Sequence, residues 1–106
     1  MMIKKIDIET LKEKLEKDEL VLIDVLDPEK FQESHIKGAI NIPLQKIASE
    51  AKDRFDHNEM IVVYCSDKDC TASPTAARKL EEVGFANVYH YPGGKKEWKE
   101  AGLPME

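Results

Sequence analysis

The chain has 106 residues, and its hydrophobic fraction of 42% is enough for the core of one ordinary domain. Its 16 Lys and Arg stand against 21 Asp and Glu, and a net charge of -5 disfavours a surface that neutralises nucleic-acid phosphates. The apolar runs are shorter than the ~20 residues that span a bilayer, and Lys4 and Lys5 are charged where a signal peptide is apolar. We therefore expect one cytoplasmic domain over residues 1–106, with no nucleic-acid or membrane partner.

The first half of the chain alternates predicted helices and strands. Asp7 precedes apolar residues at helical spacing, so it is placed to cap a helix that runs to about residue 17. Residues 20–26 form a near-continuous apolar run, which is typical of a strand buried on both faces of a parallel sheet. The elements predicted next are a short helix at 29–33, a short strand at 38–43 that ends in proline, and a helix at 44–55.

The second half continues the same alternation. Residues 60–64 are a third apolar strand, followed by a polar loop. Ser73 as cap, Pro74 as the first helical residue and Gly84 as the stop predict a helix over residues 73–83. A fourth strand at 87–91 and a last helix at 95–101 complete the pattern. We therefore predict an α/β fold with a central, mainly parallel sheet flanked by helices on both faces.

Cys65 stands where the third strand ends, at the edge of a parallel sheet where ligands usually bind. The backbone amides of the following loop and the positive end of the next helix favour an anion there. The same field lowers the pKa of a thiol, because it stabilises the thiolate. The alternative interpretation is that Cys65 is a small buried residue at a strand end, as many free cysteines are.

Cys65 and Cys70 are the two cysteines of the chain, which disfavours a disulfide-stapled secreted scaffold and a four-cysteine zinc site. His35, His57 and His90 are scattered, with no pair at metal-ligand spacing. We expect neither a metal nor a cofactor. For Cys70, a reactive role and a role as a loop thiol that fills a local gap both remain open.

The sequence resembles the rhodanese family over residues 6–104. The resemblance lies in three separated blocks, which occur in the family's order. The first contains VLIDV (21–25) and HIKGAINIP (35–43), the second contains VYC (63–65), GF (84–85) and NVY (87–89), and the third contains GG (93–94), WK (98–99) and AGLP (101–104).

The resemblance implies a single three-layer domain of rhodanese type with an active-site loop that opens at Cys65. It also implies a sulfurtransferase in which a small anionic donor such as thiosulfate leaves its outer sulfur on Cys65. A thiol or protein acceptor then removes the sulfur from the Cys65 persulfide. Cys65 is the expected catalytic residue, and the expected substrate-binding residues are those of the loop: Ser66, Asp67, Lys68, Asp69, Cys70 and Thr71.

The loop differs from the basic loops of many family members. Ser66 follows the cysteine where an arginine is common, and Lys68 lies between Asp67 and Asp69, so the local charge is negative. The loop is also longer than in the short-loop members. Family members with a second loop cysteine, here Cys70, resemble this chain more closely.

Two other functions remain as alternatives. The thiols of Cys65 and Cys70 would form a reversible disulfide in a redox or partner-binding module without transferase activity, provided that their α carbons approach within ~4.4 to 6.8 Å. A phosphatase or arsenate reductase would need an oxyanion-clamping arginine at the position that Thr71 occupies, so this alternative is disfavoured.

Overall fold

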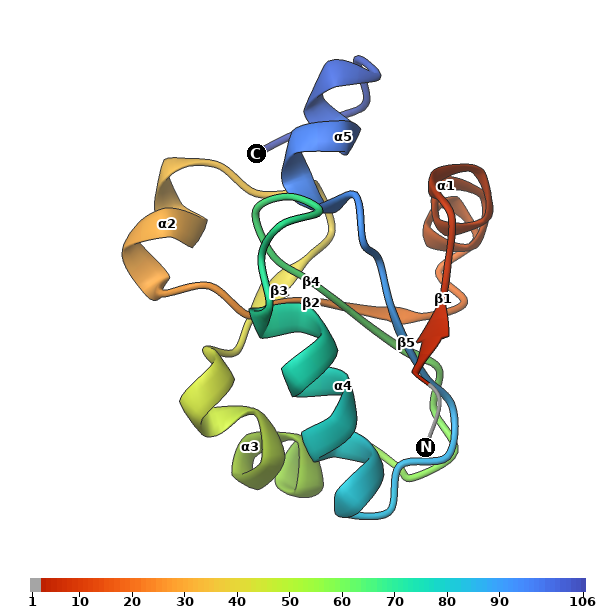
Figure 1. Cartoon of the computed structure of the whole chain (residues 1–106). Helices are drawn as coiled ribbons and strands as arrows, with labels where there is room; N and C mark the ends of the chain where they lie inside the picture. The colour runs from red at the N-terminus through yellow and green to blue at the C-terminus, as the bar shows by residue number, and fades with distance from the viewer. Residues whose placement is uncertain (1–2) are drawn as a thin grey trace.

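The fold is an open sheet of parallel strands with helices on both sides, seen in a computed structural model that describes residues 3–106 (Figure 1). The order of the strands in the sheet is β1-β5-β4-β2-β3, and every pairing is parallel. The elements in chain order are β1 (Lys4–Lys5), α1 (Ile8–Glu16), β2 (Val21–Asp24), α2 (Pro28–Glu33), β3 (Ile40–Asn41), the 3-10 helix η1 (Leu44–Lys46), α3 (Ile47–Arg54), β4 (Ile61–Tyr64), α4 (Ala72–Glu82), β5 (Val88–His90) and α5 (Gly94–Glu100).

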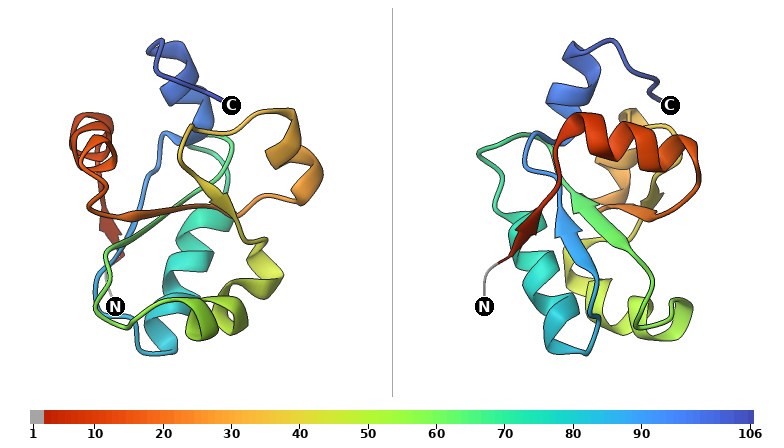
Figure 2. Two further views of the ribbon diagram at one scale, coloured as in Figure 1. Left: turned by 180° about the vertical axis from the view of Figure 1, so that it is seen from behind. Right: turned by 90° about the vertical axis from the view of Figure 1, so that its right-hand side faces the viewer.

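Two layers of helices enclose the sheet, as Figure 2 shows from behind and from the side. On one face, Ile47 of α3 and Leu80 of α4 pack against alternate residues of the central strands. On the other face, Leu11 of α1 and Trp98 of α5 pack against the remaining strand residues. This arrangement confirms the predicted α/β fold class.

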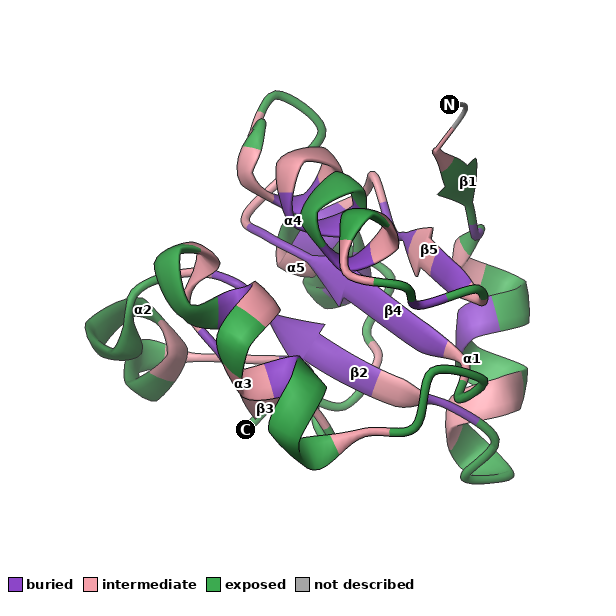
Figure 3. Ribbon diagram, turned by 90° about the horizontal axis from the view of Figure 1, so that it is seen from below, coloured by how far each residue is buried: buried purple, intermediate pink, exposed green. Residues whose placement is uncertain are grey.

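The central strands β2 and β4 are the most deeply buried part of the sheet (Figure 3). Their register runs from Val21 opposite Ile61 to Asp24 opposite Tyr64, and all four residues of β4 are fully buried. A strand that is covered on both faces needs apolar residues at consecutive positions. The near-continuous apolar runs therefore located both strands correctly, although each observed strand is shorter than its run.

The structure corrects two expectations from the sequence. The exposed pair that forms β1 was not predicted as a strand, because two lysines carry no apolar pattern. The prediction that Ser73 caps the helix is also wrong: the N-cap is Thr71, two residues earlier, and α4 begins at Ala72. Both the amide and the hydroxyl of Thr75 donate to the carbonyl of Thr71, which starts the first turn there. Ser73 instead lies buried inside the helix.

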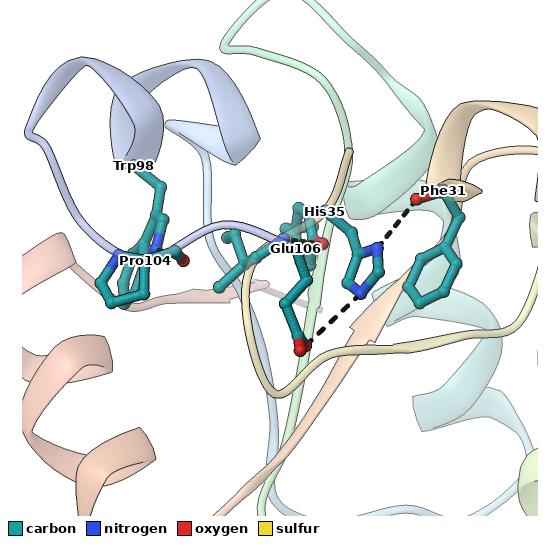
Figure 4. A network of polar contacts seen from close by, with 7 residues as sticks. Phe31, His35, Trp98, Pro104 and Glu106 are labelled. Carbon is teal, nitrogen blue, oxygen red and sulfur yellow. Dashed lines mark hydrogen bonds and ion pairs between the residues drawn. The ribbon is translucent and has the colours of Figure 1, made fainter. Parts of the chain in front are cut away.

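The C-terminal residues are tied back to the domain by polar contacts (Figure 4). The indole of Trp98 donates to the carbonyl of Pro104 at 2.9 Å, and Met105 bridges to Ile36 in antiparallel fashion. The Nδ1 atom of His35 lies 2.8 Å from the carbonyl of Phe31, and its Nε2 lies 3.8 Å from the Glu106 carboxylate. His35 and Trp98 thus act in packing and hydrogen bonding.

Among residues 3–106, no helix is long and apolar enough to cross a membrane.

The packing of α4 on the sheet gives a test of the core. Leu80 is fully buried, so Leu80→Ala is expected to lower the free energy of unfolding by roughly 2–5 kcal/mol through lost burial and a residual cavity. Lys79 is exposed in the same helix, and Lys79→Ala is expected to change the free energy of unfolding by less than about 0.5 kcal/mol. Urea unfolding of the two variants measures the difference, and equal losses would contradict the described packing.

Candidate active site

Cys65 directly follows β4, at the carboxyl end of the central strand of the sheet. Its side chain is only 1% exposed and belongs to the core cluster under α3 and α4. The carboxyl edge of an open parallel sheet is where ligands bind in this class of fold. The structure therefore places the predicted nucleophile where chemistry is expected.

The loop over residues 65–71 turns back on itself around Asp67. The carbonyl of Asp67 accepts from the amide of Cys70 at 3.2 Å, and its side chain accepts from the amide of Asp69 at 3.0 Å. This pair of hydrogen bonds is a tight turn with an Asx contact, a conformation that aspartate favours. The turn brings Cys70 back to Cys65, and the two are joined by a disulfide with α carbons 6.4 Å apart.

The beginning of α5 holds the first two residues of this loop. The amide of Lys95 donates to the carbonyl of Cys65 at 3.0 Å, and the amide of Lys96 donates to the carbonyl of Ser66 at 2.9 Å. Such close approach requires Gly94, because an added Cβ atom would lie 2.6 Å from the Cys65 carbonyl oxygen. Gly94 also has a φ of 64°, a conformation that glycine adopts without steric cost.

A cleft of about 310 Å³ opens beside the loop, between it and α5. Its lining combines three loop residues predicted as substrate-binding with four residues from the last helix and the turn before it. The lining residues are Asp67, Lys68, Asp69, Gly93, Lys96, Glu97 and Glu100. Four carboxylates and two ammonium groups make the charge of the cleft net negative.

The other predicted loop residues lie around the cleft rather than along it. Ser66 is half-buried under its contact with α5, and Cys70 is half-buried against the core. Thr71 is exposed as the N-cap of α4, and its side chain makes no capping hydrogen bond.

Sequence reasoning missed the contribution of α5 to this cleft. The sequence predicted a helix here but no role in the site, yet Lys96, Glu97 and Glu100 share the side of the helix that faces the loop. Their spacing of three and four residues is the signal that places them together. Glu97 is oriented there by Tyr91, whose hydroxyl donates to the Glu97 carboxylate. Burial raises the pKa of Tyr91, so this hydroxyl keeps its proton.

Asp24 is a fully buried carboxylate at the end of β2, next to the strand that carries Cys65. Its Oδ1 accepts from the amide of Leu26 at 2.9 Å, whereas its Oδ2 has no hydrogen-bond partner within residues 3–106. Burial raises the pKa of Asp24, and the Leu26 amide only partly opposes this effect. Asp24 therefore connects the end of β2 to the turn that follows it, although its burial disfavours the charged carboxylate.

His90 and Ser73 form a second buried polar pair near the loop. The hydroxyl of Ser73 lies 3.4 Å from Nδ1 of His90, and both side chains are buried. Burial lowers the pKa of His90, with a smaller contribution from Lys5. This pair connects the first turn of α4, and hence the end of the loop, to β5.

A larger apolar cavity of about 610 Å³ lies elsewhere, between α1 and the outer side of β2 and β3. Leu15, Leu22 and Ile40 are among its lining residues, whereas none of residues 65–71 in the described chain lines it. The cavity is therefore separate from the site at Cys65.

The open parallel sheet, with a cysteine-headed loop at its carboxyl edge, defines an α/β domain with a cysteine pair between strand and helix. Residues 7–101 match the model of the rhodanese-like domain. The chain belongs to this family.

Known proteins similar to the chain include a thiosulfate sulfurtransferase and a longer transcriptional regulator. Thiosulfate sulfurtransferase GlpE of Actinobacillus succinogenes is 36% identical over 92 residues, covering 87% of this chain and 80% of that protein. An HTH-type transcriptional regulator of Mycobacterium tuberculosis is 36% identical over 91 residues, which are 86% of this chain and 39% of the regulator. The chain thus spans well under half of that relative.

The fold is shared with solved structures of the family. A crystal structure of a protein from Bacillus halodurans superposes with a TM-score of 0.90 at 30% identity. The alignment covers 97% of this chain and 76% of that one.

The contact between Gly94 and the loop gives a matched pair of variants. Gly94→Ala and Gly102→Ala each place alanine at positive φ, at a cost of about 1–2 kcal/mol, but an added Cβ at Gly102 meets nothing within 4 Å. We expect Gly94→Ala to lose roughly 1–3 kcal/mol more, because its methyl group collides with the backbone of Cys65 and Ser66. Urea unfolding measures both variants, and equal losses would contradict the close contact.

The buried Asp24 carboxylate gives a prediction on pH. Its pKa is raised in the folded protein, so the folded state binds more protons than the unfolded state above about pH 4. The stability contributed by Asp24 is therefore present in acid and is lost as the pH rises through the folded pKa.

Asp24→Asn keeps an oxygen that accepts from Leu26 but cannot ionise. The free energy of unfolding of the parent, minus that of the variant, should fall as the pH rises from 4. Urea unfolding of both proteins at several pH values above 4 measures this difference. A difference that rises with pH would contradict the prediction, because it would show that the fold stabilises ionised Asp24.

Proposed function

We propose that this domain is a sulfurtransferase that carries sulfane sulfur as a persulfide on Cys65. The Cys65 thiolate attacks the outer sulfur of a small anionic donor such as thiosulfate. A new S–S bond forms, and the donor's S–S bond breaks with its electron pair leaving on sulfite. A thiol or protein acceptor then attacks the outer sulfur of the persulfide and regenerates the Cys65 thiolate.

The observation that carries this proposal is the position of Cys65 between a buried central strand and the start of α4. Because α4 has 11 residues, its aligned peptide dipoles favour negative charge at the loop, where a thiolate or persulfide anion would form. The name of the similar thiosulfate sulfurtransferase from Actinobacillus succinogenes supports the same chemistry.

The loop residues Ser66 to Thr71 are the proposed donor-binding segment. Lys68 and Lys96 supply positive charge, but the carboxylates that line the cleft outnumber them. A cleft of negative net charge repels a dianion and lowers its local concentration. We therefore expect thiosulfate to load Cys65 slowly, and a less charged donor or a protein donor to load it faster.

The proposed cycle also implies a reducing compartment. Cys65 must return to the thiolate after each transfer, and its disulfide with Cys70 must be opened first. The cytoplasm holds thiols in this reduced form. We therefore propose a cytoplasmic location.

A second candidate function is favoured by the disulfide itself. With α carbons 6.4 Å apart, Cys65 and Cys70 meet the geometric requirement for reversible oxidation. The domain would then act as a redox or partner-binding module in which no sulfur is transferred.

Mass spectrometry of the reduced protein distinguishes the two functions. Cys70→Ser, incubated with thiosulfate or inorganic polysulfide, is expected to gain the mass of one sulfur atom per chain on Cys65. The double variant Cys65→Ala/Cys70→Ser, which contains no thiol, is the matched control and is expected to gain none.

Absence of the adduct with both donors would overturn the sulfurtransferase proposal. If the parent then cycled between dithiol and disulfide in glutathione buffers, the redox module would be the better description.

A further inference from the structure

Cys70 is within bonding reach of the atom that would carry the sulfur. The turn at Asp67 closes the loop so that the two cysteines, five positions apart in sequence, are joined. The first half of the loop is held by α5 through the carbonyls of Cys65 and Ser66. Cys70 is held by the turn and by its contact with the core. Both sulfur atoms are therefore positioned by the fold.

The surroundings of Cys65 hinder competing attack from outside. Its side chain is 1% exposed, so an external nucleophile must reach into the loop. The cleft beside the loop is net negative, and thiolates and sulfite are themselves anions. A thiol that is already positioned in the same loop does not have to enter the cleft, because its effective concentration is set by the fold rather than by diffusion.

We propose that Cys70 is a second catalytic residue, which resolves the Cys65 persulfide and releases sulfide. The inference rests on the proposed persulfide at Cys65 and specifies how that persulfide is consumed. The Cys70 thiolate attacks Sγ of Cys65, a bond forms between the two cysteine sulfurs, and the persulfide S–S bond breaks. The electron pair leaves on the outer sulfur as HS⁻.

The complete cycle is balanced when an external reductant is included. Two cysteine thiols and one thiosulfate yield one Cys65–Cys70 disulfide, one sulfite and one hydrogen sulfide. The sulfane sulfur is reduced, and the two cysteines are oxidised. A dithiol, either a protein or a small molecule, must then reduce the disulfide before the next turnover. The class of reaction for this step is therefore dithiol-dependent reduction of sulfane sulfur, which consumes the Cys65 persulfide when no external acceptor removes the sulfur first.

A single turnover without external thiol tests this proposal. The parent and Cys70→Ser are reduced, freed of reductant under anaerobic conditions and mixed with excess thiosulfate. Sulfide is quantified, and each protein is analysed by mass spectrometry. We expect the parent to release one equivalent of sulfide per chain and to end as the disulfide without accumulated persulfide. Cys70→Ser should retain the sulfur and release sulfide at least about 100-fold more slowly until dithiothreitol is added.

Two further variants complete the experiment. Cys65→Ser keeps Cys70 and should neither gain sulfur nor release sulfide. Cys70→Ala repeats the loss of the thiol without a hydroxyl, and urea unfolding verifies that both Cys70 variants fold.

The outcomes separate this inference from the function on which it rests. If Cys70→Ser gains sulfur and the parent also keeps its persulfide without releasing sulfide, Cys70 is not the resolving residue and the inference is overturned. If no sulfur appears on Cys70→Ser and none is released from the parent, the persulfide itself is absent and both proposals are overturned.

Discussion

Backbone contact between the start of α5 and the first two loop residues is the constraint on which the site depends. The amides of Lys95 and Lys96 occupy the carbonyls of Cys65 and Ser66, so the end of β4 continues into a fixed segment. The contact is possible only because residue 94 has no side chain. The antiparallel contact of the C-terminal residues and the Trp98 indole keep α5 in place. Residues far from Cys65 in sequence therefore determine where its sulfur lies.

The charge of the site follows from the same arrangement. The loop alone has two carboxylates around one lysine, and α5 adds Glu97 and Glu100 with a single compensating lysine. If this cleft receives the sulfur donor, as we propose, its negative net charge selects against free dianions and for donors with a positive or neutral surface. Part of the specificity of this domain would then reside in repulsion rather than attraction.

Much of the fold was predictable because buried parallel strands and capped helices leave strong local patterns. The runs at 20–26 and 60–64 predicted the two central strands, and Asp7 caps α1 through the amide of Thr10. Local patterns failed where tertiary contacts decide. The two lysines of β1 form a strand because they pair with β5. Ser73 has the residue type of a helix cap, but in the fold it lies inside α4 and packs against His90.

Only the part of the candidate site that follows β4 directly was predictable from local sequence patterns. Cys65 and the loop up to Thr71 are contiguous with β4, so chain position alone indicates them. The α5 residues reach the cleft through a long-range contact at Gly94, which has no local sequence signature beyond the glycine pair itself. The disulfide between Cys65 and Cys70 depends on the turn in which the amide of Cys70 donates to the carbonyl of Asp67. This turn is a matter of backbone conformation.

The outer strands of the sheet have a consequence for how the domain behaves among other chains. An open sheet ends in two edges with unpaired backbone groups, which are templates for another strand. Here both edge strands, β1 and β3, are only two residues long, and β1 consists of exposed lysines. One of these, Lys4, also lies over the ring of Tyr89 and donates to the carbonyl of Ala86. Two short edges, one of them charged, discourage strand-to-strand aggregation of this domain.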